Sequence, residues 1–255
     1  MDDLSNSFSV LELDAEDDKV PTVTAADNRE SANGRGKGNK KGESSGGESS
    51  GDTTISKKEN GGHGSLEVVS GECRFPLVWI DLEMTGLDIQ VDRILEIACV
   101  ITDGHLTKSI EGPDLVIHQT KECLDRMGEW CQSHHAASGL TERVLLSTIS
   151  EQEAEKQVIE FVKRNASTYT PLLAGNSVYV DLQFLKKYMP VLAGLFSHVL
   201  VDVSSVKALC LRWYPKDNRK APQKENKHRA MDDIKESIAE LKYYKQHIFK
   251  AKTKK

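Results

Sequence analysis

The order of the apolar segments constrains the fold more than any other feature of the sequence. Short apolar runs at 75–82, 93–102 and 109–118 have the length and composition of β-strands. Asp103-Gly104, between the last two runs, is typical of a hairpin-type turn. We therefore expect the folded part to begin with three strands in an antiparallel meander.

The pattern then alternates between helix and strand. Helices are predicted at 150–165, 180–188, 204–213 and 228–249, strands at 171–174 and 199–202, and a polar loop at 214–227. Strands followed by alternating helices and strands predict an α/β fold with a mixed sheet.

The first 70 residues differ in composition from the rest of the chain. They contain 10 of the 18 glycines and one of the 15 aromatic residues. They also carry 8 Lys and Arg against 14 Asp and Glu, a net charge of −6, which leaves +1 for residues 71–255. Such a segment buries too little apolar surface to offset its chain entropy. We predict a disordered acidic, Gly/Ser-rich extension at 1–70, one domain at 71–250 and a basic tail at 251–255.

Several classes of protein are disfavoured by the sequence. No run approaches the roughly 18 apolar residues of a membrane helix, so no membrane association is expected. No secretory signal is apparent, the first residues are acidic, unlike a mitochondrial transit peptide, and the five cysteines form no CxxC pair. We expect a cytoplasmic protein with reduced thiols, with mitochondria as the alternative compartment.

Two carboxylates flank Leu82 at the end of the first apolar run. Strand alternation places Asp81 and Glu83 on one face and Leu82 on the other. The spacing alone is weak evidence, because Asp14-Ala-Glu16 has it too. Charge at the end of an apolar strand is costly unless it is compensated, either by a salt bridge or by a metal ion. Both alternatives remain open at this point.

Further acids follow at predicted helix starts. Asp181 opens the helix after Gly175-Asn-Ser177, and His228 and Asp233 begin the last long helix. Helix capping and solvated first-turn acids explain each residue separately, since the helix dipole favours negative charge there. Taken together, the acids match the way oxygen ligands for hard cations are assembled in an α/β domain.

The order of these residues resembles the DEDDh group of 3′-to-5′ exonucleases, and within it the oligoribonuclease family. The resemblance covers about residues 74–250. It is carried by Trp79-Ile-Asp-Leu-Glu-Met-Thr-Gly-Leu87, Arg93-Ile-Leu-Glu-Ile-Ala98, Ala137-Ser-Gly-Leu-Thr-Glu-Arg-Val144, Gly175-Asn-Ser177, Lys187-Tyr-Met-Pro190, Asp202-Val-Ser204 and His228-Arg-Ala-Met-Asp-Asp-Ile-Lys-Glu-Ser-Ile-Ala-Glu-Leu241.

The resemblance implies an RNase H-like fold and a hydrolase that degrades short single-stranded oligoribonucleotides from the 3′ end to nucleoside 5′-monophosphates. It implies two Mg²⁺ or Mn²⁺ ions and a general base that takes a proton from water. The implied metal ligands are Asp81, Glu83, Asp181 and Asp233, and the implied base is His228.

The resemblance also implies a set of substrate contacts. Leu82 matches a residue that wedges against the terminal base, and Trp130 one that faces the bases; both could instead be core residues. His135, Ser177 and Ser204 match positions that grip the 5′ phosphate, and Ser177 could also cap a helix.

One motif departs from the family. His198-Val199 stands where the family usually carries a Tyr-Arg pair, whose arginine helps to cap the 5′ phosphate. We therefore expect weaker discrimination in favour of the shortest substrates than in close relatives. The family is homodimeric, with the tyrosine reaching the neighbouring subunit; we expect a homodimer here, although the contact made from His198 is open.

Two other functions compete with this hypothesis. A DNA-proofreading or tRNA-trimming exonuclease would bind long strands through a strongly basic groove, which the near-neutral charge of residues 71–255 disfavours. A catalytically silent nucleic-acid-binding module would not need the intact set of acids. The sequence does not distinguish Mg²⁺ from Mn²⁺, or RNA from DNA.

Overall fold

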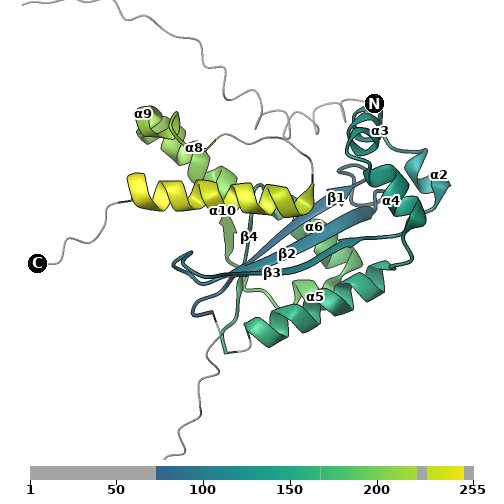
Figure 1. Ribbon diagram of the computed structural model, residues 1–255, viewed down its shortest axis with the longest axis horizontal. Coiled ribbons are helices and arrows are strands. Elements are labelled where there is room, and N and C mark those ends of the chain that lie inside the picture. Colours follow the sequence, from purple (N-terminus) through teal and green to yellow (C-terminus); the bar gives the residue numbers. More distant parts are fainter. Residues whose placement is uncertain (1–72, 167, 223–228, 250–255) are drawn as a thin grey trace, which may run out of the picture. The chain divides into compact units, whose positions relative to one another are not determined.

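The computed structural model describes residues 73–166, 168–222 and 229–249 (Figure 1). The predicted extension at 1–70, the predicted tail at 251–255 and the predicted base His228 lie outside these residues. The described residues all fall within the domain expected at 71–250.

The first three strands form the expected antiparallel meander. They are β1 (Leu77–Met84), β2 (Ile94–Thr102) and β3 (Ser109–Val116), paired as β1–β2 and β2–β3. The connection from β2 to β3 is longer than a tight hairpin. The carboxylate of Asp103 organises it by accepting hydrogen bonds from the backbone N–H groups of Thr107 (2.6 Å) and Lys108 (2.9 Å).

Two further strands make the sheet mixed. β4 (Leu172–Gly175) pairs with β1 in parallel, and β5 (Leu200–Asp202) pairs with β4 in parallel. The strand order is β3-β2-β1-β4-β5. Because β1, β4 and β5 run in the same direction, their carboxyl ends lie at one edge of the sheet. The predicted α/β fold with a mixed sheet flanked by helices is confirmed.

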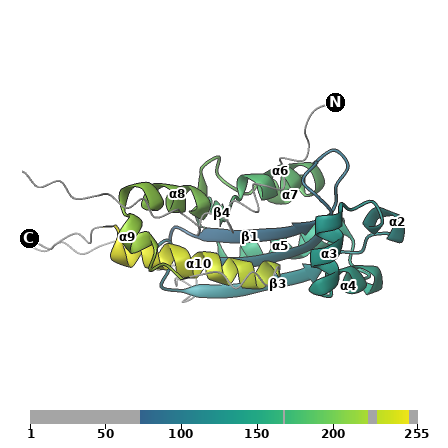
Figure 2. The same ribbon diagram turned by 90° about the horizontal axis from the view of Figure 1, so that it is seen from above.

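Helices cover both faces of the sheet. The helices among the described residues are α2 (Lys121–Leu124), α3 (Glu129–Ala137), α4 (Leu140–Leu146), α5 (Glu151–Asn165), α6 (Tyr179–Tyr188), α7 (Pro190–Ala193), α8 (Val203–Trp213), α9 (Pro215–Asn218) and α10 (Ala230–His247). Figures 1 and 2 show α5 and α10 on opposite sides of the sheet.

Strand alternation divides the buried side chains between the two faces. Val78 and Ile80 of β1 belong to the apolar cluster that includes α5 and α6, whereas Leu77 and Trp79 belong to the cluster that includes α8 and α10. Trp79 is fully buried, and its indole N–H donates a hydrogen bond to Thr102 Oγ1 (3.0 Å). The same alternation turns Asp81 towards the α10 side.

The helical half differs from the predictions in detail. Pro190, expected to end a helix, also occupies the first position of the short helix α7, where its missing N–H costs nothing. The predicted loop at 214–227 contains the short helix α9 in its described part. None of the described helices has the length and apolar character needed to cross a membrane.

Candidate active site

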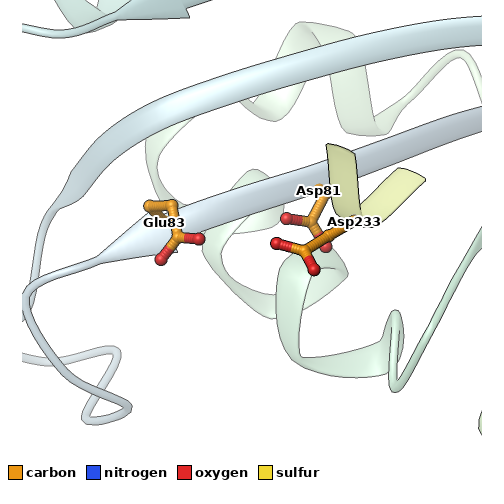
Figure 3. A group of neighbouring side chains, drawn as sticks. All are labelled: Asp81, Glu83 and Asp233. Carbon is orange, nitrogen blue, oxygen red and sulfur yellow. The ribbon is translucent and has the colours of Figure 1, made fainter. Parts of the chain in front are cut away.

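Three carboxylates converge at the end of β1. One oxygen atom from each of Asp81, Glu83 and Asp233 lies within 4.8 Å of the others. Asp81 and Glu83 come from β1 and Asp233 comes from the first turn of α10. Figure 3 shows the two β1 side chains directed to the same region as Asp233.

Local structure explains why these side chains meet. A register shift follows Glu83, so Asp81 and Glu83 are the last two residues of the regular alternation on their face of β1. Asp233 is fixed along the helix axis because its N–H donates to the backbone carbonyl of Arg229 (3.0 Å). Ile234, on the next position of α10, is buried against the sheet and sets the helix rotation.

Asp181 lies beside this group but outside it. It is in the first turn of α6, as expected, and its side chain is buried. Its Oδ1 atom accepts a hydrogen bond from the backbone N–H of Leu82 (3.0 Å), the residue between the two β1 acids. Burial raises the pKa of Asp181, the hydrogen bonds that it accepts lower it, and the nearby charge of Asp202 raises it.

The electrostatics of the site fit a bound cation. Burial, and to a lesser extent the negative charges of Asp233, Glu96 and Asp181, together raise the pKa of Glu83 from 4.5 to about 8. Carboxylate oxygens gathered in a poorly solvated place repel one another, and they are also the preferred ligands of hard divalent cations. The donor set of Asp81, Glu83 and Asp233 therefore suits an ion such as Mg²⁺ or Mn²⁺.

A second polar cluster lies at the carboxyl ends of β4 and β5, where two predicted phosphate contacts meet. Ser177 Oγ and Ser204 Oγ are 3.1 Å apart. Asp202, the N-cap of α8, accepts hydrogen bonds from the backbone N–H groups of both serines (3.0 Å each). Ser177 has a positive φ of 46°, a strained conformation for a residue other than glycine. It is not the N-cap of α6, which is Val178, without a side-chain cap hydrogen bond.

The other predicted substrate contacts lie nearer β1. His135 of α3 is buried, and its Nε2 atom donates to the carbonyl of Met84 (2.9 Å), which leaves Nδ1 facing Glu83 Oε2 at 3.9 Å. Trp130 is partly buried and stacks on His134, with ring centroids 3.9 Å apart. Leu82 is buried in the apolar cluster on the α5 side, the core location that its sequence context left open.

Three polar residues around the site were not singled out from the sequence. Asp202 caps α8, and Glu96 and Arg229 form an ion pair beside the acidic group. A signal existed for two of them. Glu96 is a charged residue inside an apolar strand, and a buried charge is costly unless an opposite charge pairs with it. Asp202 stands between a strand and a helix, a typical position for an N-cap aspartate.

The sheet and its converging acids define a nuclease of the exonuclease class. Residues 78–241 match the family model described as RNase_T, Exonuclease. The chain is 58% identical to the oligoribonuclease of Arabidopsis thaliana over 99% of this chain and 100% of that protein. It is 51% identical to the mitochondrial oligoribonuclease of Homo sapiens over 69% of this chain and 74% of that protein. The chain belongs to the exonuclease family, and within it to the oligoribonucleases.

More distant solved structures share the fold. The zinc-bound form of an E. coli ExoI–ssDNA complex superimposes with a TM-score of 0.51 at 15% identity, over 69% of this chain and 41% of that one. An apo Exonuclease I structure gives a TM-score of 0.52 at 15% identity, over 68% and 42%. This chain thus spans about two fifths of the length of those exonucleases, and at such identity the likeness concerns the fold.

Proposed function

We propose that this protein is a 3′-to-5′ exoribonuclease that degrades short oligoribonucleotides to nucleoside 5′-monophosphates. The observation that carries the proposal is the convergence of Asp81, Glu83 and Asp233 oxygens within 4.8 Å at the end of β1. Its substrate class follows from membership of the oligoribonucleases, at 58% identity to a relative matched along its whole length.

Two divalent cations, Mg²⁺ or Mn²⁺, are proposed to be held by Asp81, Glu83, Asp181 and Asp233. Such ions lower the pKa of water and neutralise charge that develops on the phosphate. Three of these residues have oxygens within 4.8 Å of one another, and the fourth lies against the backbone between Asp81 and Glu83. The raised pKa of Glu83 supports the proposal, because excess negative charge is what a cation relieves.

The chain's other residues are proposed to bind and orient the substrate. His228, outside the described residues, acts as the base that takes a proton from the attacking water. Trp130 stacks on a base. Leu82 is buried in the apolar cluster on the α5 side, so the expected wedge against the terminal base is not part of the proposal. The Ser177–Ser204 pair contacts the 5′ phosphate, which limits the substrate to a few nucleotides because one end is held at each cluster. His135 lies beside Glu83 at the acidic group, so it is not proposed as a contact of the 5′ phosphate.

The test is hydrolysis of 5′-labelled RNAs of two to ten nucleotides, with Mn²⁺ or Mg²⁺ and with a chelator control, resolving products by length. We expect one-nucleotide steps from the 3′ end that stop with the chelator. The Asp233→Ala variant should lose at least about 100-fold in turnover while it remains folded by circular dichroism. Turnover that survives in this variant would refute the proposed metal site. DNA oligonucleotides of the same lengths are assayed in parallel, and cleavage of the DNA but not of the RNA would refute the substrate class.

Assembly and compartment are parts of the same proposal. The protein is proposed to act as a homodimer in the cytoplasm, with mitochondria as the alternative. The Arabidopsis thaliana relative is named without a compartment, while the Homo sapiens relative is named mitochondrial. Imaging of the full chain with a C-terminal fluorescent tag distinguishes the two compartments.

A further inference from the structure

Glu96 is a buried carboxylate in the middle of an apolar strand. Every residue of β2 is buried, and Glu96 has no exposed surface. In the β1–β2 register Glu96 is directly opposite Glu83, so both side chains leave the sheet on the α10 side. An ionised group in this position needs strong compensation from its neighbours.

Arg229 provides most of that compensation. Its Nη2 atom donates to Glu96 Oε1 (2.8 Å) and its Nε atom donates to Glu96 Oε2 (3.3 Å). Arg143 of α4 adds a longer contact to Oε1 (3.4 Å). The hydrogen bond to Glu96 is also the largest cause of the raised pKa of Arg229. The two-point contact fixes the orientation of the guanidinium as well as its distance from β2.

The same carboxylate reaches the start of α10. Arg229 is the N-cap residue of this helix, and its side chain makes no capping hydrogen bond. Glu96 Oε2 accepts instead from the backbone N–H of Ala230, with a donor–acceptor distance of 3.4 Å. Negative charge at a helix N-terminus interacts favourably with the free N–H groups and the helix dipole. A residue of β2 therefore supplies what the local sequence of α10 lacks.

This contact is one turn of helix from the acidic group. The carbonyl oxygen of Arg229 accepts hydrogen bonds from two backbone N–H groups, those of Asp232 (2.9 Å) and Asp233 (3.0 Å). Arg229 is thus held on one side to Glu96 through its side chain and on the other to Asp233 through its backbone. A change at Glu96 or Arg229 would shift the first turn of α10, and with it the Asp233 carboxylate, relative to Asp81 and Glu83.

We propose that Glu96 and Arg229 are positioning residues, which hold the first turn of α10 against the sheet so that Asp233 stays within ligand distance of Asp81 and Glu83. The inference rests on the proposed function, since it assumes that these acids bind a divalent cation. Neither residue contacts substrate. Their effect is on the affinity for the cation.

The experiment is calorimetric titration of Mn²⁺ into the full chain without nucleic acid, well below the unfolding temperature. Arg229→Met keeps an unbranched apolar side chain and removes the forked donors. Because residues that orient metal ligands typically affect affinity 10–100-fold, we expect a loss of about tenfold or more. In turnover assays the half-saturating Mn²⁺ concentration should rise by a similar factor, with kcat largely recovered at high Mn²⁺.

A matched control exists on the other face of the sheet. Arg93, directly before β2, makes two hydrogen bonds to Glu151 in the first turn of α5. Arg93→Met breaks a similar strand-to-helix pair without touching α10, so Mn²⁺ affinity should stay within about twofold of the unsubstituted protein. If Arg93→Met weakens Mn²⁺ binding as much as Arg229→Met, or if Arg229→Met leaves it within twofold, the inference is overturned.

A second variant distinguishes a loss of folding in Arg229→Met from a loss of positioning of Asp233. If Arg229→Met unfolds because Glu96 is left as an uncompensated buried charge, the double variant E96Q/R229M removes that charge. It should fold and still bind Mn²⁺ about tenfold more weakly; affinity like that of the unsubstituted protein would contradict the inference. If the unsubstituted protein itself binds no Mn²⁺, the proposed metal site is refuted, and the positioning role of Glu96 and Arg229 is refuted with it.

Discussion

At the scale of single residues, the site is dominated by negative charge in a poorly solvated place. Glu83 has Asp233, Glu96 and Asp181 as its negative neighbours, and Arg229 is the only positive one among the main influences on its pKa. Positioning such groups costs stability in the metal-free protein, because burial and mutual repulsion both favour the protonated acids.

Without metal, the protein should lose stability as the pH rises. An acid whose pKa is raised by folding contributes its full stability below its unfolded pKa and loses it as the pH rises through the folded value. For Glu83 this window runs from 4.5 to about 8, and the raised pKa of Asp181 acts in the same direction. The free energy of unfolding, measured by urea denaturation with a chelator, should fall between about pH 4.5 and pH 8.

The variant Glu83→Gln tests the origin of that slope. A neutral amide of the same shape no longer titrates, so the decrease in stability between these pH values should become shallower. An unchanged slope would show that other groups cause it. Saturating Mn²⁺ provides the complementary control, since bound cation should oppose the loss in the unsubstituted protein.

Substrate length preference is also predicted to depend on single residues. His198 and Val199 are both exposed and directly precede β5, the strand that leads to Asp202 and Ser204. A missing arginine donor to phosphate is worth about 1.5–3 kcal/mol. Val199→Arg should therefore raise the rate on dinucleotides relative to heptanucleotides by roughly tenfold or more. A strong dinucleotide preference already present without the substitution would contradict this prediction.

At the scale of elements, the packing of helices on the sheet depends on close approach at a few positions. α5 lies over β3 where Gly112 leaves room for the ring of Phe161. α10 instead lies against the other face, through Ala230, Ile234 and Ile238. Helix positions follow from the shapes of both surfaces, so a small change on a strand can displace a helix.

Gly112→Ala should destabilise the fold. A β-carbon at this position would lie 2.3 Å from Cε1 of Phe161, so the ring and α5 must shift. Overpacking of this kind costs about 1–3 kcal/mol, measurable by chemical denaturation. Gly128→Ala is the control, because no atom lies within 4 Å of its added β-carbon, and it should cost less than about 1 kcal/mol. Equal effects of the two substitutions would exclude the contact with Phe161 as the cause.

At the scale of the whole molecule, the strand order places two polar clusters at one edge of the sheet. The acids lie at the end of β1 and the start of α10, and the serine pair and Asp202 lie at the carboxyl ends of β4 and β5. These strands are parallel neighbours, so their carboxyl ends are adjacent although the residues are far apart in the chain. A short substrate held between the two clusters needs no long basic groove.

The assembly can be measured directly. A chain of 28.3 kDa should sediment as a dimer of twice that mass at micromolar concentration, as expected for an oligoribonuclease. Sedimentation equilibrium is the appropriate measurement, because it reports the mass independently of molecular shape. A single species with the mass of one chain would refute the prediction.

The sequence by itself determined the order of strands and helices and the positions of the acids along it. Alternation in β1 and the acids in the first turns of α6 and α10 are local features, readable within a few residues of sequence. The long, periodic final helix was predictable for the same reason. Short helices such as α7 and α9 were not, because four residues carry too little pattern.

Only the tertiary structure decided which distant groups compensate one another. It brought Arg229 to Glu96 across 133 positions of sequence and Asp181 to the backbone of Leu82 across 99. It also buried Leu82 in the core and His135 beside Glu83. Sequence patterns report local backbone preference and the need to bury apolar surface. The partner of a buried charge depends on how elements pack, which no local pattern encodes.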